Sequence, residues 1–289
     1  MKKLVAALML AGVLASIPLS EAMMIAPSPI SQRVARADAV VLGKVTSIAE
    51  KTEKAEMFKG DERPMKVATV AVEEAVSGKK RKTVKVAFFP LPPPPPPGGG
   101  IRIIRGGRGT VQLTKGQEAM FFLTKHPTTK DLYVVQQYFD VVTKTADPSF
   151  AAQRDEAKKY AQVLKEAKSA LASKDAKLSP EGAMMLVARY RGAPAGGTKT
   201  EAVPADESKK ILLALAGADW KPPTGRFGVA TPMNTFYLLG LQPKDSWIAP
   251  KDGTQFPAAA KKWLEANAGK YKMTRYVRES DVKDETEPE

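Results

Sequence analysis

The chain has 289 residues, enough for about two ordinary domains of roughly 100 to 200 residues each. Its 43% hydrophobic and 26% charged residues exclude wholesale disorder and a polytopic membrane protein, and the absence of cysteine excludes disulfides, thiolate metal sites and a cysteine nucleophile. Lysine and arginine outnumber aspartate and glutamate by 45 to 31, and the resulting net charge of +14 hints at an anionic partner.

The first 22 residues have the pattern of a cleaved export signal. Lys2 and Lys3 precede an apolar stretch at residues 4–19, and Ser20 and Ala22 place small residues at the positions that signal peptidase reads. An uncleaved membrane anchor is the alternative, but the stretch is shorter than the about 20 residues that span a bilayer. We therefore expect cleavage after Ala22, export to the periplasm or the extracellular space, a mature chain without a transmembrane segment, and a linker at residues 23–36.

The next part of the chain predicts β-strands, because its apolar residues recur at every second position or form short runs between turn formers. The expected strands cover residues 37–48, 66–76, 83–89, 119–123 and 132–142. Five such strands without a strong helix among them favour a small closed barrel, since closure removes exposed sheet edges. We expect a five-stranded OB-type β-barrel at residues 37–146.

Three segments of this half resemble a known group of small barrels. They are ADAVVLGKV at residues 37–45, VSG at residues 76–78 before a basic stretch, and LTKGQEAMFFL at residues 113–123. They resemble an exported bacterial barrel similar to the netrin-type or tissue-inhibitor-of-metalloproteinases-like OB fold. The animal inhibitors chelate a protease zinc through an N-terminal Cys-x-Cys ridge. Because this chain has no cysteine, the resemblance implies the fold for residues 37–142 but no inhibitory residue.

A loop rich in proline and glycine, at residues 90–110, is expected to interrupt the barrel. Six consecutive prolines at residues 92–97 favour an extended polyproline II rod, and three glycines follow them. One interpretation is a ligand-binding arm that carries Arg102, Arg105 and Arg108. We favour an expanded surface loop, because a single RGG-type repeat is far short of a tract and loop closure entropy grows slowly with length.

From residue 147 the apolar period changes from two to about 3.6, which predicts a second, α-helical domain at residues 147–278. The expected helices cover residues 150–172, 180–190 and 206–216, a short stretch after Thr231-Pro232, and residues 257–269. Their proline-containing loops favour an irregular bundle, so the fold class is a two-domain α+β protein. TPMNTF at residues 231–236 and FPAAAKKWL at residues 256–264 resemble a helical region that uncharacterised exported bacterial proteins join to such a barrel. The acidic residues 279–289 predict a disordered tail.

No residue pattern identifies a reaction. His126 is the single histidine, which is too few for a multi-histidine metal site, and its place before Pro127 predicts a turn residue. No serine lies in a Gly-x-Ser-x-Gly turn, and no glycine-rich loop has the lysine spacing of a phosphate cradle. We therefore expect no catalytic residue, no metal and no cofactor.

Two basic clusters stand out in the barrel half. They are Lys79, Lys80, Arg81 and Lys82, which are consecutive, and Arg102, Arg105 and Arg108, which are evenly spaced. The strand between them, about seven residues at ~3.3 Å each, is expected to hold the clusters over ~20 Å apart. They are therefore interpreted as two solvated loop tips at opposite ends of the barrel.

The leading hypothesis is an exported, non-enzymatic protein that binds another protein or an envelope component of unknown identity. The first alternative is a polyanion-binding protein that uses both basic clusters on an anionic envelope polymer or nucleic acid. The second is a hydrolase with a scattered site, which requires a concave pocket lined by titratable groups.

Overall fold

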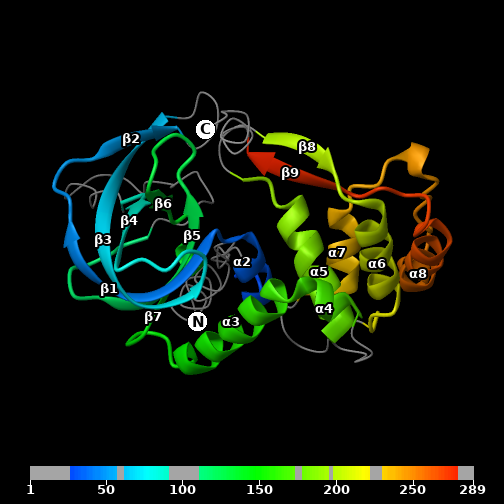
Figure 1. Ribbon diagram of the computed structural model, residues 1–289, viewed down its shortest axis with the longest axis horizontal. Coiled ribbons are helices and arrows are strands. Elements are labelled where there is room, and N and C mark those ends of the chain that lie inside the picture. The colour runs from blue at the N-terminus through cyan, green and yellow to red at the C-terminus, as the bar shows by residue number, and fades with distance from the viewer. Residues whose placement is uncertain are drawn as a thin grey trace, which may run out of the picture.

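The computed structural model describes residues 27–56, 62–90, 111–172, 178–194, 198–221 and 230–278 (Figure 1). The chain has an α+β fold, in which a mixed sheet lies on one side and most of the helices lie on the other. The predicted signal peptide, residues 91–110 of the predicted loop and the predicted acidic tail lie outside the described residues. Over the described ranges, no helix has the length and apolar character needed to cross a membrane.

The strands of the first half pair into a ring. They are β1 (Ala39–Ile48), β2 (Glu53–Glu56), β3 (Glu62–Ser77), β4 (Thr83–Phe88), β5 (Glu118–Lys125), β6 (Leu132–Val134) and β7 (Val141–Thr143). The pairing runs from β1 to β3, β4, β6 and β5, and β5 pairs again with β1. The pair β4–β6 is parallel and the other pairs of the ring are antiparallel. β2 extends β3, and β7 extends β5.

Strands β1 and β5 are covered on both faces, which explains their nearly continuous apolar sequences. Side chains alternate between the two faces of a strand. Val41 and Phe121 point into the cluster enclosed by the ring, whereas Val40, Met120 and Phe122 belong to a second cluster shared with helices. The two strands therefore join the ring to the rest of the molecule.

Two strand predictions need correction. The segment predicted as one strand at residues 132–142 is divided into β6 and β7 by a short 3-10 turn at Tyr138–Asp140. The Asp140 carboxylate accepts a hydrogen bond from the Gln137 backbone N–H at 2.9 Å, which stabilises the turn. Strand β2 was not predicted, because its sequence EKAE has no apolar alternation.

Helix α2 (Ile30–Arg36) lies between the ring and the other helices, where a plain linker was predicted (Figure 1). Its Ile30 and Val34 are buried one turn apart and pack in the cluster that contains Phe122 of β5 and Met185 of α5 (Leu178–Arg191). The sequence pattern missed this helix because seven residues contain only one repeat of the helical period. The ring and the helices thus share a hydrophobic cluster.

The second half contains the predicted helices and an unpredicted two-stranded sheet. Besides α5, the helices are α3 (Phe150–Lys165), α4 (Ala167–Ala172), α6 (Ala205–Ala216), α7 (Pro232–Leu238) and α8 (Phe256–Asn267). The helix predicted at residues 150–172 is divided at Glu166. Strands β8 (Thr198–Ala202) and β9 (Thr274–Arg278) pair antiparallel, so this half is not wholly helical. Both strands are short and mainly polar, so they lack the apolar alternation that predicts a strand.

Local capping and an aromatic cluster organise the second half. The Thr231 hydroxyl accepts a hydrogen bond from the Asn234 backbone N–H at 3.1 Å and begins α7, as the Thr-Pro pair predicts. The buried ring of Phe236 makes edge contacts with Trp247 and Trp263, at centroid distances of 4.7 and 5.8 Å. These large rings fill the core beneath α6 and α8.

Candidate functional site

The basic turn predicted as a ligand-binding cluster, Lys79–Lys82, connects β3 to β4, and all four of its residues are exposed. Arg81 forms an ion pair with Asp131 at 2.7 Å, and this hydrogen-bonded contact raises the pKa of Arg81 and lowers the pKa of Asp131. The turn is therefore a solvated tip that is partly neutralised by its neighbour. The second predicted cluster, Arg102, Arg105 and Arg108, lies outside the described residues.

His126 is a buried turn residue between β5 and β6. Its Nδ1 accepts hydrogen bonds from the backbone N–H groups of Thr128 and Thr129, at 3.3 and 3.0 Å. These bonds fix the turn, which agrees with the role expected from the sequence.

Three adjoining hollows surround α2, and we call them together the α2 cleft. The first hollow, of about 490 Å³, lies between α2, α3 and α5. The second hollow, of about 420 Å³, lies between α2, the end of α5 and β9. The third hollow, of about 280 Å³, lies between the first and the second. The third hollow shares Ser28 and Arg33 with the first, and Arg36, Thr124 and Gln136 with the second. The cleft follows the boundary between the ring and the helices.

The second hollow is strongly basic, and we call it the basic hollow. Its described lining contains one carboxylate, that of Asp38, and the arginines Arg36, Arg189, Arg191 and Arg278. These residues come from α2, α5 and β9 and from the residue before β1. The fold therefore assembles a cation cluster from distant parts of the chain.

Two of these arginines connect the ring to the helices. Arg278 contacts both carboxylate oxygens of Asp38, at 3.1 and 2.5 Å, and both side chains are largely buried. Arg189 donates to the carbonyl oxygens of Ala35 and Ala37 at 3.3 and 2.9 Å. These carbonyls lie at the C-terminal end of α2, where helical partners are lacking. Both arginines have structural roles.

Arg191 holds the far wall of the basic hollow. Its Nε donates to the Leu238 carbonyl at 3.0 Å, and one terminal nitrogen donates to the Thr274 hydroxyl at 2.7 Å. Its guanidinium carbon lies 4.8 Å from the ring centroid of Tyr276, a cation–π contact. Arg191 therefore joins α5, α7 and β9.

Arg36 differs from the other three arginines, because it reaches solvent and forms no hydrogen bond or ion pair with any described residue. Partial burial lowers the pKa of Arg36, and the nearby Asp140 carboxylate opposes this shift. Its aliphatic stem lies against Gly192, where a Cβ atom would come within 3.2 Å of Arg36 Cγ. The side chains of Thr124 and Gln136 line the same hollow and also make no hydrogen bonds within the described ranges. A carboxylate or phosphate group entering here meets charged and neutral donors that are not already used.

The third hollow contains two opposite charges, the buried Arg33 and the half-buried Asp140. Arg33 donates to the Phe139 carbonyl, and its guanidinium lies 3.9 Å from the ring centroid of Phe122. Burial lowers the pKa of Arg33 to about 10, although nearby carboxylates oppose the shift. Burial also raises the pKa of Asp140 to about 6, against the opposing effect of Arg33 and of backbone N–H donors. At neutral pH both groups remain charged.

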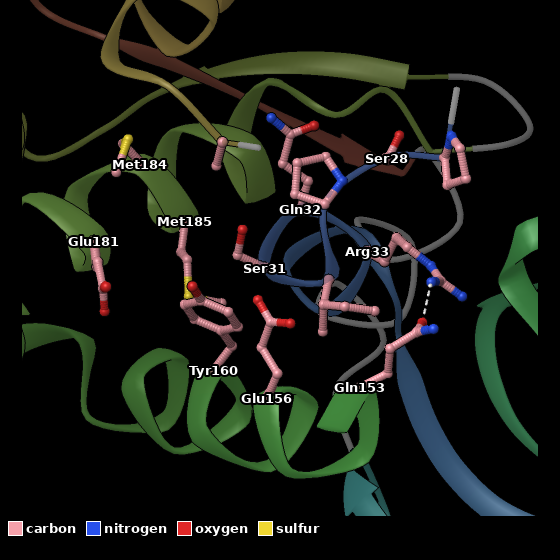
Figure 2. A pocket seen from close by; sticks show the side chains of 14 residues that line it. Ser28, Ser31, Gln32, Arg33, Gln153, Glu156, Tyr160, Glu181, Met184 and Met185 are labelled. Atoms are coloured by element: carbon pink, nitrogen blue, oxygen red, sulfur yellow. Dashed lines mark hydrogen bonds between the residues drawn. The ribbon is translucent and has the colours of Figure 1, made fainter. Parts of the chain in front are cut away.

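The first hollow has the opposite character to the basic hollow, and we call it the acidic hollow (Figure 2). Glu156 and Tyr160 enter it from α3, and Glu181 enters it from α5. Burial raises the pKa of Tyr160 to about 12, with a further contribution from the two carboxylates.

Sequence reasoning missed the α2 cleft because its residues are not neighbours in the chain. Arg36, Gln136, Arg189 and Arg278 are separated by 50 to 100 positions from one to the next. The local signals were the pairs of arginines at the ends of α2 and α5, and cations there are also favoured by the helix dipole.

Among the described residues, no group of three or more acidic or histidine side chains is arranged to hold a metal ion. No protein-family model matches the chain, and no curated protein matches its sequence.

Proposed function

We propose that this chain is an exported, non-enzymatic binding protein that holds an anionic group of its ligand in the basic hollow. The observation that carries the proposal is the exposed Arg36, which has no partner among the described residues and lies beside three arginines that are already fixed. Export rests on the signal-like pattern of residues 1–22.

The shared chemistry of the ligand is an oxyanion, either a carboxylate or a phosphate. A planar guanidinium forms paired hydrogen bonds with both groups, and Thr124 and Gln136 supply further donors. The volume of about 420 Å³ lies within the range of small-molecule sites, roughly 300 to 1,000 Å³. The hollow therefore suits an anionic group with several attached atoms.

We also propose an OB-type barrel for residues 37–146 and an irregular helical domain for residues 147–278. The ring order β1-β3-β4-β6-β5, with β5 pairing again with β1, supports the barrel, because OB folds are five-stranded and partly open. The end of β7 at Thr143 and the start of α3 at Phe150 support the boundary. The shared cluster around α2 supports a single binding unit built from both parts.

Isothermal titration of the purified chain tests the proposed anion site, with pyrophosphate and citrate as separate probes. We expect saturable binding of at least one probe, and a loss of about tenfold or more in affinity in Arg36→Gln, because a hydrogen bond to a charged group contributes about 1.5–3 kcal/mol. Lys80→Gln is the matched control, because it removes one exposed cation outside the hollow. Equal losses in both variants, or no saturable binding of either probe, would overturn the proposal.

The first alternative, polyanion binding through basic loops, is favoured by the exposure of Lys79, Lys80 and Lys82. Heparin chromatography tests this alternative. It is supported if the parent chain is retained in a strongly salt-dependent way, if Arg36→Gln is still retained, and if the triple lysine-to-glutamine variant is not. The reverse pattern supports the basic hollow.

The second alternative is a hydrolase, and the acidic hollow is a concave site lined by titratable groups, as that alternative requires. The one histidine of the chain lies in the β5–β6 turn and does not line this hollow. Ser31, which does line it, is hydrogen-bonded to no general base among the described residues. We therefore keep non-enzymatic binding as the proposal.

A further inference from the structure

The acidic hollow is built from three helices. Glu156 and Tyr160 are one helical turn apart on α3, so they face the same space, and Figure 2 shows the Glu156 carboxylate pointing from α3 toward α2. Glu181 lies on α5, and Ser31 lies on α2. The hollow has a volume of about 490 Å³.

The negative charge in this hollow is only partly compensated. Lys159 pairs with Glu181 at 3.0 Å, whereas Glu156 forms no hydrogen bond or ion pair with a described residue. Burial raises the pKa of Glu156, and Glu181 adds to the shift against the opposing cations Lys159 and Arg33. The guanidinium of Arg33 also lines the hollow but donates to the Phe139 carbonyl and lies over Phe122. An added cation would therefore be stabilised beside Glu156.

A serine hydroxyl at the wall of the hollow gives an independent indication of a ligand. Ser31 is 6% exposed, lines the acidic hollow, and has no hydrogen-bond partner among the described residues. The Ser31 oxygen is not among the fully buried side-chain atoms that lack a partner, so it can be reached from the hollow. The Ser31 oxygen is thus an acceptor available to a donor that enters the hollow.

The remaining walls suit an apolar stem. Ile30, Met184 and Met185 contribute aliphatic and thioether groups, and Tyr160 adds an aromatic ring whose centroid lies 5.2 Å from Lys159 Nζ. Thioether side chains adapt to ligands of different shape, and aromatic faces attract cations. The Glu156 carboxylate accepts hydrogen bonds from N–H donors, which a protonated amine has and a quaternary ammonium lacks.

We propose that the acidic hollow binds a protonated primary amine carried on an apolar stem, with Glu156 and the Ser31 hydroxyl as acceptors. This site is separate from the basic hollow and has the opposite charge, so it stands or falls independently of the proposed anion site. The amine belongs either to a free alkylamine or to a lysine side chain of a peptide, and both present the same group.

Methyl NMR of the purified chain tests this proposal, with labelled Met184 and Met185 as local reporters. n-Pentylammonium is the probe, and 1-pentanol is its neutral counterpart of similar length. We expect saturable shifts of these methyl signals with the amine and much weaker shifts with the alcohol. A blocked tripeptide with a central lysine forms the second arm: binding of both probes extends the site to peptides, and binding of the free amine alone assigns it to small amines. Binding of neither probe would overturn the proposal.

Two variants and one control identify the acceptors. Glu156→Gln keeps the size of the side chain and is expected to weaken amine binding by about tenfold or more, and Ser31→Ala by about threefold. Asp155→Asn removes the neighbouring carboxylate, which is 64% exposed and outside the hollow, and is expected to leave binding unchanged. Equal effects of Glu156→Gln and Asp155→Asn would show that only general charge matters and would overturn the assignment. The thermal midpoint of each variant confirms that it is folded.

Discussion

The two large hollows beside α2 differ in how their charges are held. In the basic hollow, three arginines are fixed by carboxylate or carbonyl partners and one, Arg36, has no partner among the described residues. In the acidic hollow, Glu181 is neutralised by Lys159, and Glu156 has no such partner in the described part of the chain. Under both proposals, the number of charges around a hollow matters less for binding than whether each charge has a partner. Each proposal therefore assigns the ligand by the charge that has no partner among the described residues.

The largest expected effect comes from breaking the ion pair that closes the basic hollow. Asp38→Asn leaves the buried guanidinium of Arg278 without its carboxylate, so we expect a loss of about 3–5 kcal/mol in the free energy of unfolding. Urea denaturation measures this loss. The double variant Asp38→Asn with Arg278→Met serves as the control, because it removes the stranded charge and should recover part of the stability. A loss below about 1 kcal/mol in the single variant would mean that the pair is no stronger than a surface contact.

The second largest expected effect is a pH dependence of stability caused by Asp140 in the third hollow. The pKa of Asp140 is raised to about 6 by burial, above its ordinary value of 3.8, so the folded state binds this proton more readily than the unfolded state. The carboxylate therefore destabilises the fold above pH 6, and this penalty of about 3 kcal/mol disappears as the pH falls toward 4.

Asp140→Asn should flatten this part of the stability profile, which urea denaturation between pH 4 and 8 measures. Asparagine keeps an oxygen that can accept from the Gln137 backbone N–H, so the turn is retained. Glu156, whose pKa is also raised, contributes a change of the same sign and remains in the variant. An unchanged profile in Asp140→Asn would show that Asp140 is not the group responsible.

The smallest expected effect concerns the ion pair between Lys159 and Glu181 in the acidic hollow. Lys159→Gln removes the cation that neutralises Glu181, so amine binding in the acidic hollow should become about two- to fivefold tighter, as expected for one partly exposed charge. Stability should change by less than about 1 kcal/mol, because the Lys159 side chain is half exposed. Titration with n-pentylammonium measures the affinity, and the same titration of Lys158→Gln controls for general charge. Weaker binding in Lys159→Gln would show that Lys159 helps to hold the ligand.

Local sequence patterns predicted most helices and strands correctly. They missed the elements that depend on contacts with distant segments. The alternation of Val84, Val86 and Phe88 predicts β4, and the Thr231-Pro232 pair predicts the start of α7, because both signals lie within a few residues. Helix α2 and strands β8 and β9 were missed, since each is stabilised by contacts with distant segments rather than by its own periodicity. The α+β class therefore follows from the sequence, but the position of α2 does not.

The candidate site was predicted less well than the fold, for a related reason. Sequence reasoning selects charges that are adjacent in the chain, such as Lys79–Lys82, and adjacent charges lie most often in exposed turns. A binding hollow collects single residues from several elements, as Arg36 and Arg189 illustrate. Only the three-dimensional arrangement separates arginines with structural partners from the one that has none among the described residues.

The ion pair between Asp38 and Arg278 joins residues that are 240 positions apart. The ribosome adds Asp38 long before Arg278, so the basic hollow cannot be completed until β9 has been synthesised. Truncated products that stop before β9 would then keep the ring strands but lack the wall formed by Tyr276 and Arg278. The proposed anion binding would thus be lost in products that lack β9.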